Sequence, residues 1–180
     1  MKKQPEITEK TRRAFVGAFC DLYSQKPIDK ISIQEIANKS GYNRSTFYQY
    51  FSDIYELLVY VENDLLDYMR EHLKSGQNSN QTVQRVIQFF EEKGLYLNAL
   101  LGDYGSIRFL ERIKQEIPLD ELDMELSADN PLAPYLIEYH VSTSISLFRL
   151  WLRRGKDISH KVLFDFIDRL YLGGVNSIIK

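Results

Sequence analysis

The segment GYNRSTFYQYF, from Gly41 to Phe51, carries the side chains best suited to chemistry in this chain. The guanidinium of Arg44 can neutralise a phosphate or read a guanine edge, and the amide of Gln49 can pair with adenine. Hydroxyl groups able to hydrogen-bond phosphate oxygens, which fixes position without reading sequence, come from Ser45, Thr46, Tyr48 and Tyr50. The chemistry on offer is the binding of nucleic acid.

A short helix must precede this segment to brace it. The run ISIQEIA predicts a helix that begins after Ser32, with Glu35 completing a capping box. Ile31 and Ile36 have the spacing of a hydrophobic staple across that start. Gly41 is the expected stop, because glycine readily adopts the left-handed conformation that ends helices.

A second short helix is expected to follow, with Asn43 as its N-cap. Phe47 and Phe51 lie one turn apart and would anchor it on the buried side. The two helices have helix-turn-helix spacing over about residues 32–51, which presents the N-terminal side of the second helix to a major groove.

The remaining sequence predicts an all-α protein without internal repeats or convincing strand pairs. Apolar residues recur at helical spacing near residues 9–25, 54–73, 82–101, 106–116, 133–154 and 159–179. The polar segment KSGQNSNQ, residues 74–81, predicts a linker. We expect a DNA-binding head over residues 1–52, joined by the fourth helix to a C-terminal helical body over residues 53–180.

Charge is distributed unevenly along the chain. Residues 1–51 contain nine Lys or Arg against five Asp or Glu, a net charge of +4, whereas the remainder carries −6. A basic head on an acidic body indicates that only the head meets a polyanion.

Other classes of function find little support in the sequence. The single cysteine, Cys20, cannot form an internal disulfide, and no apolar run approaches the ~18 residues that cross a bilayer, so we expect a cytoplasmic protein. His72, His140 and His160 lack metal-ligand spacing. Nucleophile elbows and phosphate-binding glycine loops are missing, so we expect no enzyme, catalytic residue, metal or cofactor.

The run ISIQEIANKSGYNRSTFYQYFSDIYELL, residues 31–58, resembles the N-terminal domain of the TetR family of transcriptional regulators. The resemblance covers roughly residues 8–60, about a third of the chain, and rests most strongly on TFYQYF after a correctly spaced helix. It implies a homodimer that binds double-stranded DNA at a palindromic operator, usually as a repressor. It also implies that residues 53–180 form a variable C-terminal regulatory and dimerisation domain, which holds a small-molecule site and the dimer interface.

The resemblance assigns DNA-facing positions residue by residue. Ser32 matches a phosphate-contacting cap, and the turn and recognition helix supply Tyr42, Asn43, Arg44, Ser45, Thr46, Tyr48, Gln49 and Tyr50. One position departs from the family pattern, because Ile54 stands where many members carry a phosphate-binding lysine. Compensating charges could come from Lys2, Lys3, Arg12 and Arg13.

The C-terminal segment LFRLWLRRGKDIS, residues 147–159, resembles the turn between the last two helices of many members. Those helices would pair with their copies in a four-helix interface, through residues that include Ile145, Phe148, Leu152, Phe166 and Leu170. Polar groups that could line a ligand cavity are Arg108, Arg112, Tyr139, His140 and Ser144.

Two further hypotheses stay open at this level. The head could bind DNA without a small-molecule inducer, the body serving dimerisation or a protein partner. Alternatively, the head could serve as an adaptor that binds protein, which salt dependence would distinguish from DNA binding.

Overall fold

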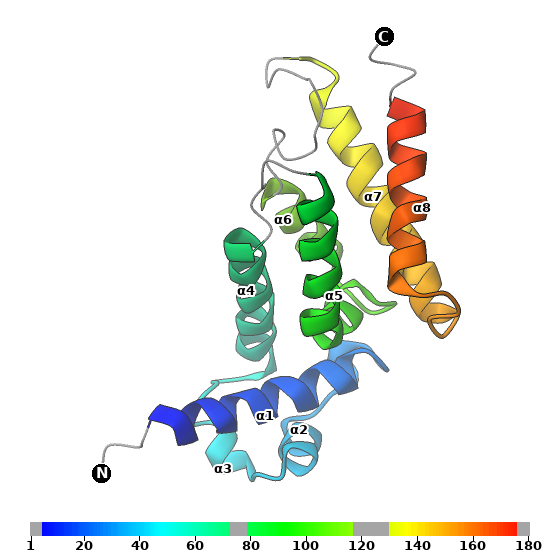
Figure 1. Cartoon of the computed structure of the whole chain (residues 1–180). Helices are drawn as coiled ribbons and strands as arrows, with labels where there is room; N and C mark the ends of the chain where they lie inside the picture. Colours follow the sequence, from blue (N-terminus) through cyan, green and yellow to red (C-terminus); the bar gives the residue numbers. More distant parts are fainter. Residues whose placement is uncertain (1–4, 73–78, 117–129, 176–180) are drawn as a thin grey trace. The chain divides into compact units, whose positions relative to one another are not determined.

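The computed structural model describes residues 5–72, 79–116 and 130–175, and every regular element within these ranges is helical (Figure 1). The order is α1 (Pro5–Tyr23), a 3-10 turn (Ile28–Lys30), α2 (Ile33–Ser40), α3 (Arg44–Phe47), α4 (Ile54–His72), α5 (Ser79–Leu101), α6 (Ile107–Glu116), α7 (Ala133–Arg153) and α8 (His160–Val175). The predicted all-α class is confirmed.

The helices form two compact units. Unit 1 comprises Met1–Tyr68 and Lys93–Phe109, and unit 2 comprises Met69–Glu92 and Leu110–Lys180. Helices α4, α5 and α6 therefore each contribute residues to both units. The predicted division at residue 52 stays a prediction.

Helix α1 forms the centre of unit 1. Its apolar stripe follows the predicted spacing, and Phe15, Phe19 and Cys20 are completely buried. The helix begins at Pro5, four residues before the predicted start. Proline suits the first turn of a helix, because its missing N–H would have no partner there.

Helices α2 and α3 lie against α1 in unit 1 (Figure 1). Ile31 and Ile36, the predicted staple pair, are both buried. Two ion pairs join α2 to the end of α1 and the loop after it: Lys39 with Asp21, and Lys26 with Glu35 at 2.5 Å. Because these pairs are exposed to solvent, burial of the isoleucines contributes most of the attachment.

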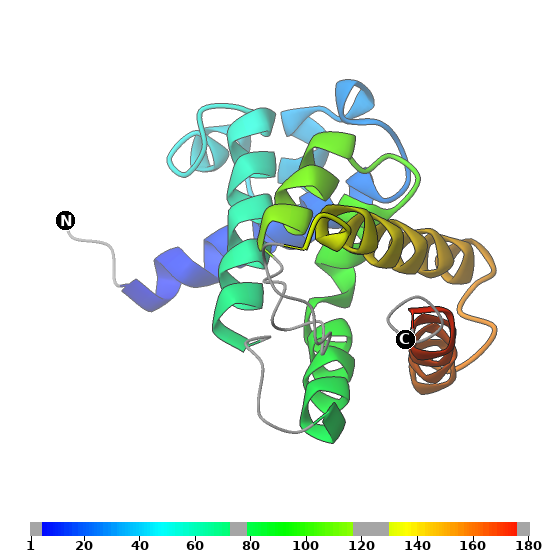
Figure 2. The same cartoon turned by 90° about the horizontal axis from the view of Figure 1, so that it is seen from above.

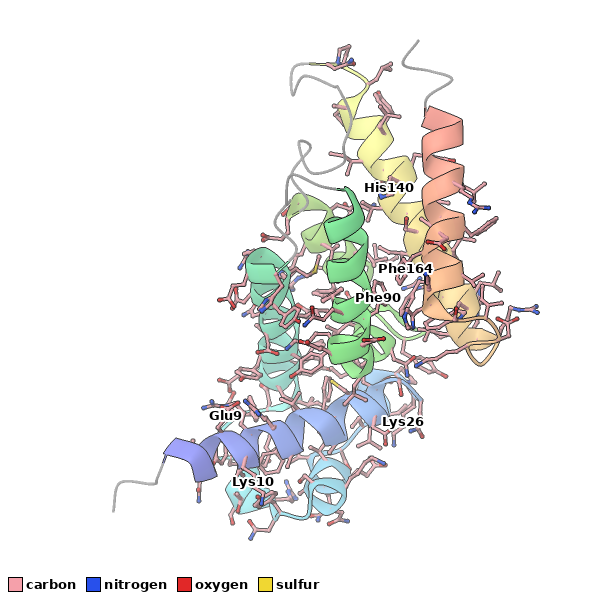
Figure 3. The ribbon with its side chains drawn as sticks, viewed as in Figure 1. Glu9, Lys10, Lys26, Phe90, His140 and Phe164 are labelled. Atoms are coloured by element: carbon pink, nitrogen blue, oxygen red, sulfur yellow. The ribbon has the colours of Figure 1, made fainter. Side chains whose placement is uncertain are left out.

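Unit 2 has an aromatic core. The ring of Phe90, on α5, lies 4.9 Å from Phe148 and 4.6 Å from Phe164, measured between ring centroids. Figure 3 shows Phe90 and Phe164 pointing toward one another from α5 and α8. Phe148 is buried, and its neighbour Trp151 donates from Nε1 to the carbonyl oxygen of Ile158 at 2.7 Å. That bond closes the turn between α7 and α8.

Helices α7 and α8 are consecutive and cross one another, since Figure 2 shows α8 nearly end-on and α7 from the side. Gly155 and Lys156 turn the chain between them with positive φ angles of 70° and 60°. The predicted last helix ran to residue 179, and residues 176–179 lie outside the described ranges. So do residues 74–78 of the predicted linker, whereas Ser79 already belongs to α5.

Replacing Gly41 by alanine is expected to destabilise the protein by about 1 kcal/mol, because Gly41 ends α2 with φ +77°. The matched control is Gly17→Ala within α1, where an added Cβ meets nothing within 4 Å. That change should stabilise the protein by about 0.5–1 kcal/mol. Urea denaturation measures the free energy of unfolding of both variants. Equal changes of the same sign in the two variants would contradict the prediction.

Candidate nucleic-acid interface

The start of α2 is fixed by the predicted capping box. Oγ of Ser32 accepts from the backbone N–H of Glu35 at 3.2 Å, and Oε2 of Glu35 accepts from the backbone N–H of Ser32 at 2.9 Å. Lys26 donates to the other carboxylate oxygen at 2.5 Å. The Lys26 hydrogen bond, followed by those from Ser32, lowers the pKa of Glu35 to about 2.

The start of α3 is fixed by Asn43, as predicted. Its Oδ1 accepts from the backbone N–H of Thr46 at 2.8 Å, from Oγ1 of Thr46 at 3.0 Å and from Oγ of Ser45 at 2.7 Å. The first of these bonds caps the helix, and the other two orient both hydroxyls. Three of the predicted DNA-facing residues are thus held as one hydrogen-bonded group.

Regular α-helix ends at Phe47, but helical hydrogen bonds continue beyond it. The backbone N–H of Tyr48 donates to the carbonyl of Arg44 at 3.1 Å, and that of Phe51 donates to Phe47 at 3.0 Å. Phe47 and Phe51 are buried, as predicted, and the Phe47 ring lies 5.4 Å from Phe15 in an edge-on contact. The Phe47 ring anchors the segment on α1, and the Phe51 ring packs on Phe47 at 5.6 Å.

Tyr42 and Tyr50 also pack against α1. Their rings are 5.4 Å and 6.0 Å from Phe15, and both residues are half-buried. Oγ1 of Thr11 donates to the hydroxyl of Tyr42 at 3.3 Å, and the guanidinium of Arg12 lies 5.9 Å from the Tyr50 ring. Both tyrosines therefore help hold the head together, a role that their sequence positions alone did not indicate.

The residues left on the surface form what we term the α3 face, which consists of Arg44, Ser45, Tyr48 and Gln49, all exposed. Nη2 of Arg44 donates to the hydroxyl of Tyr48 at 3.2 Å, and its guanidinium lies 5.9 Å from that ring. The α3 face therefore presents an arginine, two hydroxyls and an amide on a braced support, which suits hydrogen bonding to base edges and phosphates.

Helix α1 carries three basic residues, Lys10, Arg12 and Arg13. Lys10 is exposed and lies on the side of α1 that carries α3 (Figure 3), a candidate phosphate contact that the motif did not indicate. Arg13 is exposed and pairs with Glu9 at 3.0 Å, whereas Arg12 also bonds Glu9 and lies 5.6 Å from the Tyr60 ring. Lys2 and Lys3 lie outside the described residues.

Ile54, the residue that departs from the family pattern, is buried at the start of α4, so an apolar side chain fits there. The preceding Asp53 caps α4, with Oδ1 accepting from the backbone N–H groups of Tyr55 and Glu56 at 2.8 Å each. Tyr55 is exposed beside it and offers a hydroxyl that sequence reasoning missed.

The polar residues predicted to line a ligand cavity are partly brought together in unit 2. Tyr139, His140 and Ser144 border a small hollow between α7 and α8, together with Thr143, Leu147, Ile167 and Leu170. The hollow holds about 10 Å³, roughly the room of one water molecule. Burial lowers the pKa of His140. Arg112 lies outside this lining and Arg108 belongs to unit 1, so their role as ligand contacts stays a prediction.

The five residues predicted at a dimer interface differ in exposure. Phe166 and Leu170 are exposed on α8, whereas Ile145 and Leu152 are half-buried on α7. Phe148 is buried against Phe90 and so forms part of the core of unit 2.

Replacing Glu35 by glutamine is expected to destabilise the head at pH 7, because the charged carboxylate accepts from Lys26 and Ser32. Its folded pKa of about 2 lies below the ordinary value of 4.5. The stabilisation is therefore complete above about pH 4.5 and disappears as the pH falls through about 2. Urea denaturation from pH 7 to pH 2 checks this, with exposed Glu71→Gln as control. If the Glu35→Gln chain had the same deficit in free energy of unfolding at pH 2 as at pH 7, the prediction would be contradicted.

The described residues contain no group of three or more His, Cys, Asp or Glu side chains placed to hold a metal ion. Among them, too, no helix has the length and apolar character needed to cross a membrane.

In comparisons with known proteins, the head of the chain is similar to bacterial transcriptional regulators. Residues 18–61 match the family model described as bacterial regulatory proteins, tetR family. An uncharacterized HTH-type transcriptional regulator of Haemophilus influenzae is 44% identical over 50 residues, which span 27% of this chain and 24% of the relative. An HTH-type transcriptional regulator of Staphylococcus aureus is 24% identical over 166 residues, 86% of this chain and 88% of the relative.

A solved structure supports the fold over most of the chain. The crystal structure of a tetR-family transcriptional regulator from Streptomyces coelicolor superposes with a TM-score of 0.67 at 20% identity, covering 94% of this chain and 85% of that one. The head of the chain thus matches the tetR family of bacterial regulatory proteins over residues 18–61, and the chain shares the all-helical fold of a solved tetR-family regulator.

Proposed function

We propose that the chain is a homodimeric repressor that binds a palindromic operator and leaves it when a small molecule binds the body. The observation that carries the proposal is the exposed α3 face, Arg44, Ser45, Tyr48 and Gln49, on a helix-turn-helix braced by α1. Helices that read DNA present short polar and basic side chains in this way.

Each group on the head has a proposed task. Arg44 reads a guanine edge or neutralises a phosphate, and Gln49 pairs with adenine. Ser45 and Tyr48 hydrogen-bond phosphate oxygens, which sets the register of the helix in the groove. Ser32 and Asn43, which cap α2 and α3, keep both helices in the geometry that the contact needs. Lys10 and Arg13 add phosphate contacts from α1.

A dimer is proposed because α8 carries an exposed apolar stripe. Val162, Phe166 and Leu170 recur every four residues and so occupy one side of the helix, and all three are exposed. Tyr139 and Leu150 are exposed on the neighbouring α7. A contiguous apolar surface of this kind is costly to leave in water. Pairing it with a second copy would place two heads on two half-sites about 34–36 Å apart.

Release by a small molecule would act through the spacing of those heads. A ligand that prefers a body in which the heads are mis-spaced lowers DNA affinity by its differential binding to the two states, and by no more than that. The hollow bordered by Tyr139, His140 and Ser144 is the candidate starting point for such a ligand, since it combines polar groups with the apolar Leu147 and Ile167.

Fluorescence anisotropy against duplex DNA from upstream of its own gene tests the DNA-binding part of the proposal. Binding through several phosphates should weaken steeply with salt, by about 0.9 in log K for each contact per unit of log salt. A flat salt dependence would favour an adaptor that binds protein. Full DNA binding that no small molecule reverses would favour control by a protein partner.

A further inference from the structure

A lysine, two tyrosines and an aspartate join α4 to α5 within unit 1. Nζ of Lys93 lies 2.9 Å from Oδ2 of Asp64, 4.8 Å from the centroid of the Tyr68 ring and 4.7 Å from that of Tyr96. Asp64 and Tyr68 are one turn apart on α4, and Lys93 and Tyr96 are one turn apart on α5. The ammonium group is thus flanked by two rings and bonded to a carboxylate. We term Asp64, Tyr68 and Tyr96 the cage.

This arrangement is the one by which proteins recognise organic ammonium groups, because the faces of aromatic rings attract cations and a carboxylate supplies the counter-charge. Only 16% of the Lys93 side chain is exposed. Lys114 of unit 2 is equally hidden, at 15%, but it is held by two carboxylates, those of Glu111 and Glu138. The two lysines therefore differ in what surrounds the charge rather than in burial.

Within the cage, the carboxylate of Asp64 supplies the negative charge. Burial, followed by the charge of Asp64, raises the pKa of the Cys20 thiol to about 12, and burial also raises the pKa of the Tyr96 phenol. Both groups are neutral at pH 7. Asp21 affects Cys20 only as a smaller cause. Without the lysine, the cage would present a carboxylate and two ring faces with no cation between them.

We propose that Asp64, Tyr68 and Tyr96 form a binding site for an organic ammonium ligand, and that Lys93 occupies this site as a tethered competitor in the ligand-free chain. The proposal goes beyond the function proposed above and does not depend on DNA binding. A tethered group competes at an effective concentration in the millimolar range or higher. A free amine must therefore exceed that range or make additional contacts before it displaces Lys93.

The test uses n-butylammonium chloride as the probe and Lys93→Met, which keeps an apolar stem and removes the charge. Circular dichroism follows thermal unfolding at fixed ionic strength, with sodium chloride replaced stepwise by the probe. The Lys93→Met chain should gain at least about 3 °C in Tm at 100 mM probe, because the ligand binds the folded state. The unmodified chain should gain less than a third of that, since Lys93 competes.

Two further variants make the result specific. Lys114→Met removes an equally hidden lysine outside the cage and should respond like the unmodified chain. Adding Asp64→Asn to Lys93→Met should abolish the gain, because the counter-charge is lost. If Lys93→Met is unfolded at 25 °C, recovery of helicity with butylammonium but not with sodium chloride supports the proposal equally. A Tm, or an unfolded state, that responds identically to the two salts would overturn it.

Discussion

An Arg44→Ala chain is expected to bind the operator about 10- to 100-fold more weakly for each half-site, the largest loss from any single side chain of the head. The guanidinium is exposed and is held beside Tyr48 by a 3.2 Å hydrogen bond, so it is aimed outward before DNA arrives. An arginine that bonds a guanine edge contributes about 1–3 kcal/mol of discrimination. Anisotropy titrations with the operator and with single-base variants measure both the loss and any relaxed base preference.

The matched control is Arg153→Ala, which removes the same charge from an exposed arginine at the end of α7. It should leave operator binding unchanged. If Arg44 contacts a phosphate instead, binding will weaken uniformly across sequences and the salt slope will fall by about 1. Unchanged affinity and base preference in Arg44→Ala would exclude a DNA contact by this residue.

A Phe166→Glu chain is expected to be monomeric and to lose operator binding almost completely. Phe166 is 48% exposed in the middle of the stripe that it forms with Val162 and Leu170. Two copies of a glutamate facing one another across an apolar interface would cost several kcal/mol, which corresponds to at least about a 100-fold rise in the dimer dissociation constant. Sedimentation velocity measures the assembly, and anisotropy measures the operator affinity.

Lys161→Ala serves as the control, because it changes the net charge by the same single unit at an exposed position of α8 outside the stripe. This variant should remain dimeric and bind DNA normally. Circular dichroism should show native helicity for both, since neither side chain is part of the core of unit 2. A Phe166→Glu chain that stays dimeric would place the interface elsewhere.

Local sequence signals predicted the head well because each feature depends on neighbouring residues. Ser32 and Glu35 form their capping box within a single turn, and Gly41 ends α2 by its own backbone conformation. Phe47 and Phe51 are separated by one helical turn, so their spacing alone places them on one buried side. The elements that support the candidate DNA contact were therefore accessible without coordinates.

Features that depend on contacts between distant elements could not be predicted in this way. The packing of Tyr42 on Phe15 and Thr11 joins residues about thirty positions apart. The cage around Lys93 likewise requires α4 and α5 to meet, which no motif specifies. Phe148 and Phe166 both belong to apolar residues that recur at helical spacing, yet Phe148 is buried and Phe166 is exposed. Periodicity identifies an apolar face but not what covers it.

Binding to upstream DNA in the presence of excess random-sequence competitor tests the central claim most directly. The chain should select one short palindromic site at least about 1000-fold over random duplex at physiological salt. Its affinity should fall steeply as salt rises, and Arg44→Ala should reduce the selection at least about 10-fold while native helicity is retained. Equal, weak binding to every duplex, unaffected by Arg44→Ala, would contradict the account.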